Sequence, residues 1–160
     1  MYLLDANIFI QSNRTHYGLD FVPAFWDWID QAVLSGRAIS IKPILDELKA
    51  GSDDLTDWAK NRPGMFLPVD AACQPSLIQI ATWAQAGHYT QAAVSEFLGV
   101  ADYQLAAFAH AHQHTVVTFE VADPARKKRI KIPDACSAHG VSWMNPFAML
   151  RAESARFTLS

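Results

Sequence analysis

The sequence predicts an α/β fold with a central, mostly parallel sheet of four or five strands, and three observations point to it. Short segments rich in apolar or β-branched residues occur at Tyr2–Ile10, Ala38–Ile41 and Thr115–Glu120. The segments between them have helical periodicity. Strands that alternate with helices build a parallel sheet whose two faces are both covered.

The first half of the chain sets up this alternation. The opening strand at Tyr2–Ile10 is followed by a polar loop over residues 11–20. Residues 21–36 then repeat apolar side chains every three or four positions, with Pro23 near the start and Gly36 past the end, which predicts an amphipathic helix. After the strand at Ala38–Ile41, a second helix is expected over residues 42–51.

The rest of the chain continues the pattern. Residues 62–68 are rich in turn formers and separate two helical regions. Thr115–Glu120 is too short for a helix and is expected to be a strand, and residues 141–143 are expected to be extended. Further helices are expected at residues 53–61, 76–87, 90–98, 100–114, 134–140 and 145–151.

Length and composition favour one globular domain over residues 1–160. Hydrophobic residues make up 51% and charged residues 18%, which excludes a disordered or fibrous chain. No apolar run approaches the ~18 residues needed to cross a bilayer, and no secretion signal opens the chain, so we expect a cytoplasmic protein without membrane contact. Cys73 and Cys136 are too few for a disulfide scaffold and are expected in the core.

Four acidic residues stand out against this fold. Asp5 and Glu120 fall late in predicted parallel strands, and the carboxyl ends of such strands meet at the edge where ligands bind. Glu47 lies at the margin of the apolar face of its helix, whereas Asp46 points more to solvent. Asp102 lies in the first turn of a helix, on the stripe expected to face the sheet.

A shared site for these acids would explain a carboxylate in an apolar strand. An unpaired buried charge costs several kcal/mol, and like charges in one site raise the pKa of one or more of them. Hard divalent cations such as Mg²⁺ or Mn²⁺ bind oxygen ligands and offset this repulsion. We therefore expect Asp5, Glu47, Asp102 and Glu120 to converge around such an ion.

In order and spacing, four segments resemble the PIN-domain ribonucleases, and more closely a poorly characterised PIN-like subfamily of bacterial proteins. They are LLDANIFI, LDEL, ADYQLAAFA and VVTFE, and the likeness extends to FWDW, KIPDAC and NPFAMLR. The resemblance implies a three-layer α/β/α domain that hydrolyses RNA with Mg²⁺ or Mn²⁺ and leaves a 5′-phosphate and a 3′-hydroxyl. Toxin ribonucleases of toxin–antitoxin pairs are also similar, which implies an antitoxin partner.

The resemblance also implies roles for individual residues. Asp5, Glu47 and Asp102 correspond to the acidic triad that holds the metal, and Glu120 stands where the family often has an aspartate. Asn7 and Thr118 match polar positions that support the site. Asp123 and Asp134 are alternatives to Glu120 as the fourth acid, although Asp134 could instead be the N-cap of a helix.

A basic segment follows Glu120 and is a candidate contact for the phosphate backbone of RNA. Five basic residues fall within six positions, while the whole chain carries a net charge of −3, so any nucleic-acid contact must be local. A solvated loop is the alternative interpretation. The five residues are Arg126, Lys127, Lys128, Arg129 and Lys131.

Other interpretations stay open at this stage. His110 and His114 are four residues apart, which is a weak zinc signal without an evident acid or cysteine partner. The aromatic residues Phe25, Trp26 and Trp28 favour either a homodimer or partner contact or a plain core helix. A catalytically silent PIN-like module that binds RNA or protein is the alternative function. A haloacid-dehalogenase-like phosphatase is disfavoured because Asn7 stands where that chemistry needs an aspartate.

Overall fold

A five-stranded, all-parallel sheet lies at the centre of the protein. The computed structural model describes residues 1–159, and the strand order is β3-β2-β1-β4-β5. The predicted α/β class is confirmed. The strands are β1 (Tyr2–Leu4), β2 (Ala38–Ile41), β3 (Phe66–Leu67), β4 (Thr115–Val117) and β5 (Trp143–Met144).

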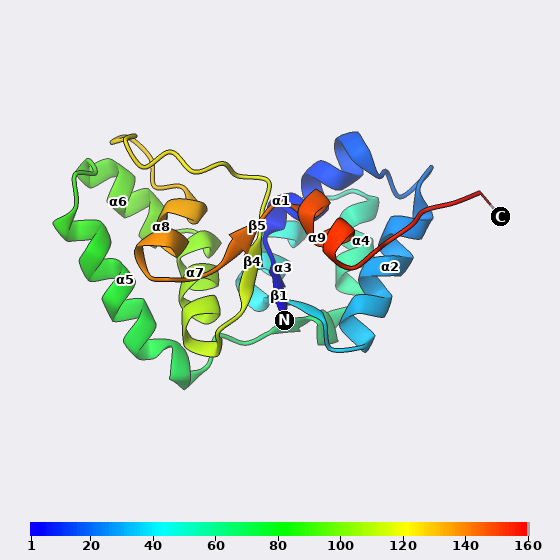
Figure 1. Ribbon diagram of the computed structural model, residues 1–160, viewed down its shortest axis with the longest axis horizontal. Helices are drawn as coiled ribbons and strands as arrows, with labels where there is room; N and C mark the ends of the chain where they lie inside the picture. Colours follow the sequence, from blue (N-terminus) through cyan, green and yellow to red (C-terminus); the bar gives the residue numbers. More distant parts are fainter. Residues whose placement is uncertain (160) are drawn as a thin grey trace.

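Helices cover both faces of this sheet, which gives three layers (Figure 1). One layer contains α1 (Ala6–Gln11), α2 (Pro23–Leu34), α3 (Lys42–Lys49), α4 (Asp54–Lys60) and α9 (Pro146–Ala152). The other contains α5 (Gln74–Ala86), α6 (Gln91–Leu98), α7 (Ala101–His112) and α8 (Ile132–Ala138). Among residues 1–159, no helix is long and apolar enough to cross a membrane.

The prediction of a strand over Tyr2–Ile10 was wrong beyond Leu4. The side chain of Asp5 accepts a hydrogen bond of 2.7 Å from the backbone N–H of Ala6 and caps α1, so the chain turns from strand to helix at that residue. A π-helical turn, η1 (Ser12–His16), continues from α1 into the segment expected to be a loop. Similarly, β4 ends at Val117, three residues before the predicted end at Glu120.

Strand β3 was not predicted. Its two residues, Phe66 and Leu67, lie in the turn-rich segment 62–68 and pair with Ser40 and Ile41 of β2 at the edge of the sheet. A segment this short carries no periodicity of its own, so only pairing with β2 defines it as a strand. Its side chains differ in burial, since Phe66 is in the core and Leu67 is exposed.

The aromatic residues of α2 pack mainly inside this chain. Phe25 and Trp26 are both buried, and the ring of Phe25 stacks on Tyr17 at a centroid distance of 4.5 Å. The indole N–H of Trp26 donates to the backbone carbonyl of Tyr17 at 2.7 Å. This contact with the residue that follows η1 buries a second side of the helix, which supports the interpretation of α2 as a core helix. A homodimer contact stays a prediction.

Strand register fixes the position of the candidate site. Leu4 of β1 pairs with Val117 of β4, so the next residues, Asp5 and Thr118, lie side by side at the carboxyl end of the sheet. The chain order of the strands reverses at this point, because β2 lies on one side of β1 and β4 on the other. Ligands of open α/β sheets bind at such a point, where loops leave the adjacent strands in opposite directions.

Candidate functional site

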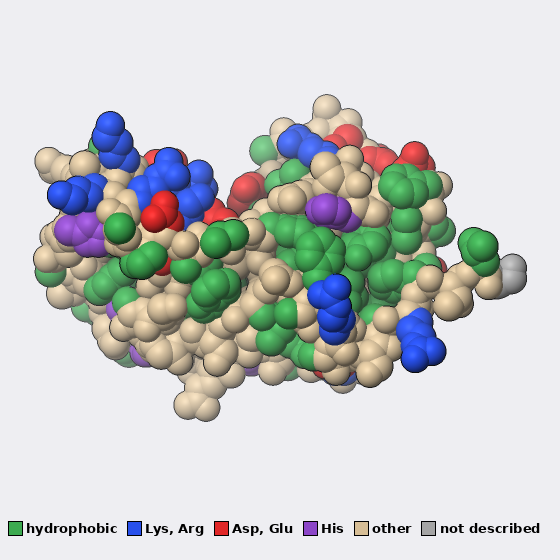
Figure 2. All heavy atoms as spheres, turned by 45° about the horizontal axis from the view of Figure 1, so that its top comes forward, with side chains coloured by type: hydrophobic (Ala, Val, Ile, Leu, Met, Phe, Trp, Pro, Cys, Tyr) green, Lys and Arg blue, Asp and Glu red, His purple; other side chains and the backbone are tan. Residues whose placement is uncertain are grey.

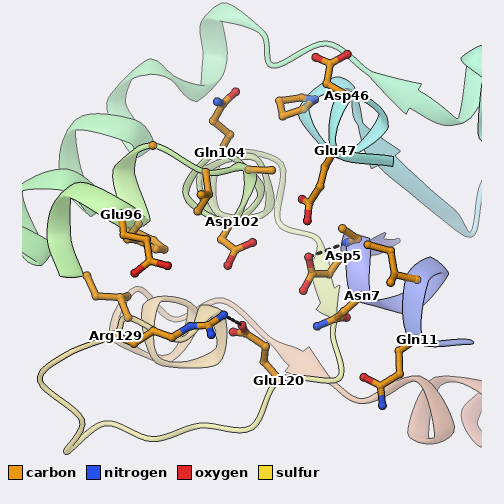
Figure 3. Close-up of a pocket in the computed structure, with 18 of the residues that line it drawn as sticks. Asp5, Asn7, Gln11, Asp46, Glu47, Glu96, Asp102, Gln104, Glu120 and Arg129 are labelled. Atoms are coloured by element: carbon orange, nitrogen blue, oxygen red, sulfur yellow. Dashed lines mark hydrogen bonds and ion pairs between the residues drawn. The ribbon is translucent and has the colours of Figure 1, made fainter. Parts of the chain in front are cut away.

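A pocket of about 820 Å³ opens at the carboxyl ends of β1 and β4 (Figure 3). It is lined by six carboxylates and two arginines, together with polar and apolar residues from several helices. All four acids predicted from the sequence line this one pocket. The carboxylates belong to Asp5, Asp46, Glu47, Glu96, Asp102 and Glu120.

Asp5 lies at the bottom of the pocket and is 4% exposed. Its carboxylate accepts hydrogen bonds from the N–H of Ala6 at 2.7 Å and from the hydroxyl of Thr118 at 2.8 Å. Burial, followed by the negative charge of Asp102, raises the pKa of Asp5 from 3.8 to about 8, and the two hydrogen bonds only partly oppose this shift. The fold therefore holds a carboxyl group where its ionised form is strongly disfavoured.

Thr118 and Asn7 orient this carboxylate. The side-chain oxygen of Asn7 accepts from the N–H of Phe119 at 3.1 Å, so its amide nitrogen faces Thr118 and donates to the hydroxyl at 3.0 Å. That hydroxyl also accepts from the N–H of Glu120 at 3.0 Å. With its acceptor sites filled, the Thr118 hydroxyl uses its proton for Asp5. The network joins the ends of β1 and β4.

Glu47 and Asp102 approach the same space from the two helical layers. Their side chains point toward Asp5 in Figure 3, while Asp46 points away from it. Burial, followed by the charges of Glu120 and Glu47, raises the pKa of Asp102 from 3.8 to about 6, and burial raises the pKa of Glu47. Burial is the largest cause of the raised pKa in Asp5 and Asp102 and the sole cause in Glu47.

Glu120 lines the pocket but is held by other groups. One of its oxygens accepts from the guanidinium of Arg129 at 2.9 Å, and the other accepts from the backbone N–H of Ile132 at 2.8 Å. Ile132 is the first residue of α8. Glu120 thus anchors the basic segment and the start of α8 at the rim of the pocket.

The two alternatives to Glu120 lie outside this pocket, since neither Asp123 nor Asp134 is among its lining residues. Asp134 is buried, and both of its carboxylate oxygens lie 3.1 Å from the backbone N–H of Asp123. It does not cap its helix, because the N-cap of α8 is Lys131 and Asp134 lies in the first turn. Its carboxylate instead orders the loop after β4.

Sequence reasoning missed Glu96, which lines the pocket from α6 and adds to the rise of the pKa of Asp102. Glu96 is an exposed residue of an amphipathic helix, and nothing in its local pattern separates it from any solvated glutamate. Its place in the pocket follows from the packing of α6 beside the start of α7.

The donor chemistry of the pocket fits a hard divalent cation. Asp5, Glu47 and Asp102 supply only oxygen ligands, as Mg²⁺ and Mn²⁺ prefer. Burial and neighbouring carboxylates raise the pKa of Asp5 and of Asp102, and a cation bound among them would favour their ionised forms. Their oxygens are not tightly clustered, because no three of the pocket carboxylates among residues 1–159 all lie within 4.8 Å of one another.

The described residues contain one closer group of potential ligands, and it lies elsewhere. Donor atoms of Asp70, Cys73 and His112 all lie within 4.8 Å of one another. The residues singled out in the histidine run, His110 and His114, are not part of it. His110 contacts the hydroxyl of Ser76 at 2.7 Å, so the first member of the predicted pair is used inside the helical layer.

The basic segment lies beside the pocket. Arg129 reaches its rim and pairs with Glu120, whereas Arg126, Lys127 and Lys128 are exposed, and Lys131 is half-buried. Lysine and arginine side chains gather over this part of the chain on the left of Figure 2, close to the hollow in that face. The carboxylates and the cationic side chains therefore share one edge of the molecule.

Comparison with solved structures defines the class of fold. FitAcB from Neisseria gonorrhoeae shares 22% identity and a TM-score of 0.56, over 92% of this chain and 99% of that chain. FitAB bound to the IR36 DNA fragment shares 21% identity and a TM-score of 0.57, over 92% and 96%. The fold is PIN-like, as the sequence predicted.

The chain belongs to the family described as a domain of unknown function, DUF4411, which it matches over residues 2–157. No curated protein matches it in sequence.

The raised pKa of Asp5 predicts that the metal-free protein loses stability as the pH rises. Its folded pKa of about 8 exceeds the ordinary 3.8, so the contribution is complete below pH 3.8 and is lost as the pH rises toward 8. The variant Asp5→Asn carries no titrating group there and should be more stable than wild type at pH 8, by roughly 5 kcal/mol at about 1.36 kcal/mol per pKa unit.

Denaturant unfolding at pH 5 and pH 8 in the presence of a chelator measures this difference. Asp46→Asn is the matched control, because this carboxylate is exposed at the rim of the same pocket. Equal destabilisation of Asp5→Asn at both pH values would contradict the assignment of the charge penalty to Asp5.

Proposed function

We propose that this protein is a metal-dependent endoribonuclease of the PIN type, and that it acts as the toxin of a toxin–antitoxin pair. The observation that supports an enzyme most directly is the convergence of Asp5, Glu47 and Asp102 in one pocket. They come from three separate elements, and the pKa of each is raised. A fold that served only stability would gain by replacing at least one of these acids.

In this proposal Asp5, Glu47 and Asp102 hold a Mg²⁺ or Mn²⁺ ion. Such an ion supplies a Lewis acid for the phosphodiester and lowers the pKa of a bound water. The positions of the three carboxylates on different elements leave room between them for substrate oxygens. The pocket, at about 820 Å³, has more space than a single ion fills, as a site that also takes a substrate requires.

The remaining polar residues have supporting roles. Thr118 and Asn7 keep the Asp5 carboxylate in one orientation through the network that joins β1 and β4. Glu120 assists at the rim and positions Arg129 next to the carboxylates. A guanidinium in that place can bind a phosphate oxygen, because it is the group best suited to phosphate recognition.

The basic segment provides the electrostatic contact with RNA. Exposed Arg126, Lys127 and Lys128 lie next to a pocket that is itself acidic. Contacts from such residues to phosphates are independent of base sequence and hold the strand near the acids. The toxin role is supported by the PIN-like fold and by the resemblance to toxin ribonucleases, and it implies an antitoxin protein that covers this edge.

Replacing metal ligands should abolish turnover without unfolding the protein. Wild type is expected to gain thermal stability with Mn²⁺ and to cleave a mixed RNA pool only when Mg²⁺ or Mn²⁺ is present. Asp5→Asn and Asp102→Asn should lose the Mn²⁺-dependent shift in melting temperature and at least about 100-fold in cleavage rate, since even residues that only support a ligand contribute about 10–100-fold.

Asp46→Asn is again the control, because Asp46 is adjacent to Glu47 but points away from Asp5. It should cleave RNA at the wild-type rate. A wild-type protein that binds RNA but neither shifts with Mn²⁺ nor cleaves would instead support a catalytically silent binding module.

Thr118→Val should weaken metal binding while preserving shape. The change removes the donor to Asp5 and leaves the Asn7 amide and the Glu120 N–H without their acceptor. Mn²⁺ affinity should fall by about 10–100-fold, as for other residues that orient a ligand. Isothermal titration measures this, and Thr118→Ser, which keeps the hydroxyl, should restore most of the affinity.

Neutralising the exposed basic residues should weaken RNA binding without changing metal binding. In the triple variant Arg126→Ala, Lys127→Ala and Lys128→Ala, the slope of log affinity against log salt should fall by about 2, because each lost contact with single-stranded RNA reduces it by about 0.7. The matched control replaces three exposed basic residues outside the pocket, Lys49, Lys60 and Arg156. Equal slopes for both triple variants would exclude the segment as the RNA contact.

A further inference from the structure

The group formed by Asp70, Cys73 and His112 lies at the opposite end of α7 from the acidic pocket. Asp102 is in the first turn of this helix, and His112 is its last residue. Ten residues of α-helix rise about 15 Å, so the two groups are well separated. His112 also precedes β4, so the group lies near the amino ends of the strands, where the proposed ribonuclease has no use for it.

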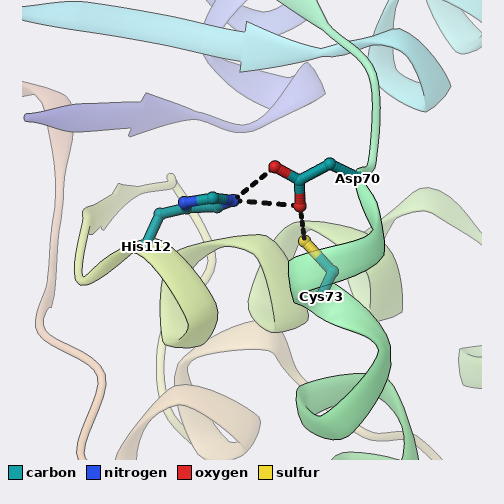
Figure 4. A group of neighbouring side chains, drawn as sticks. All are labelled: Asp70, Cys73 and His112. Carbon is teal, nitrogen blue, oxygen red and sulfur yellow. Dashed lines mark hydrogen bonds and ion pairs between the residues drawn. The ribbon is translucent and has the colours of Figure 1, made fainter.

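Asp70 bridges the other two residues (Figure 4). Its carboxylate oxygens lie 3.0 and 3.1 Å from Nε2 of His112, and the thiol of Cys73 donates to it at 3.2 Å. The three side chains come from two elements, the turn η3 (Ala71–Cys73) with the residue before it, and the end of α7. A thiol, an imidazole nitrogen and a carboxylate oxygen thus face one small space.

We propose that Asp70, Cys73 and His112 bind a Zn²⁺ ion that fastens the chain after β3 to the end of α7. Zinc takes sulfur, nitrogen and oxygen ligands in tetrahedral geometry. This mixed donor set differs from the all-oxygen set of the acidic pocket, which favours Mg²⁺ or Mn²⁺. The two groups therefore select different metals.

Exposure is consistent with ion entry from solvent. The side chains of Asp70 and His112 are 46% and 29% exposed, whereas Cys73 is fully buried. An ion would approach past the carboxylate and imidazole, take the place of the thiol proton, which passes to water, and keep one position for a water molecule. The buried sulfur of Cys73 would bind the ion from the side of the core.

The position of the group indicates a structural role. Asp70 and His112 are 42 positions apart in the sequence, and the segment between them contains α5, α6 and most of α7. A metal that binds only where the two ends of this segment meet in the folded protein stabilises the folded state by its binding free energy. Fastening this loop also fixes the far end of the helix that carries Asp102.

Cobalt substitution in the full-length protein tests the proposal. We expect chelator-treated wild type to bind Co²⁺ with the near-ultraviolet charge-transfer absorption of a cobalt–thiolate bond, at one such ion per chain. Cys73→Ser should lose this band. Cys136→Ala, which removes the other fully buried cysteine, should keep it. So should Asp5→Asn, so failure of the ribonuclease proposal would leave this result unaffected.

A second measurement covers the case in which Cys73→Ser does not fold. Zn²⁺ in excess should raise the melting temperature of Asp5→Asn, which lacks a ligand of the acidic pocket, by about 5 °C or more. The rise should disappear when His112→Gln, a change at a partly exposed helix end, is added to this variant. A wild type without the thiolate band, or a band lost in Cys136→Ala and kept in Cys73→Ser, would overturn the proposal. An equal Zn²⁺ shift in Asp5→Asn with and without His112→Gln would overturn it as well.

Discussion

The carboxylate of Asp5 lies at the carboxyl end of the central strand, where burial and the charge of Asp102 oppose its ionisation. Two hydrogen bonds, from Ala6 and Thr118, fix its orientation and only partly offset the loss of water. The same carboxylate ends β1 and begins α1. One side chain thus links the start of the sheet, the first helix and the candidate site, and the rest of the pocket is arranged around it.

The parallel sheet explains how distant acids come together. Register between β1 and β4 brings Thr118 beside Asp5, and the helices that follow β2 and precede β4 bring Glu47 and Asp102 over the same edge. The resulting concentration of negative charge is costly for the folded state. Arg129 offsets part of it through Glu120, and the same ion pair ties the basic segment to the rim.

The two candidate metal-binding groups lie at opposite ends of α7 and differ in the ligand atoms that they offer. At one end of α7, hard oxygen ligands surround a wide pocket, as suits an ion that must exchange ligands with a substrate. At the other end, Asp70, Cys73 and His112 converge more tightly, as suits an ion held for stability. Helix α7 carries Asp102 in its first turn and His112 as its last residue. A contact that holds the His112 end of α7 in place therefore also helps to position Asp102.

The sequence by itself determined the alternation of strands and helices, because periodicity and the positions of proline and glycine are local signals. A charge in an apolar segment is also a local signal, and it led to the candidate acids Asp5, Glu47, Asp102 and Glu120. Local signals could not reveal strand β3, which exists only through pairing with β2. Nor could they reveal Glu96 in the pocket or the meeting of Asp70 and Cys73 with His112. Those features depend on how helices separated in sequence pack across the sheet, and only the tertiary structure decided them.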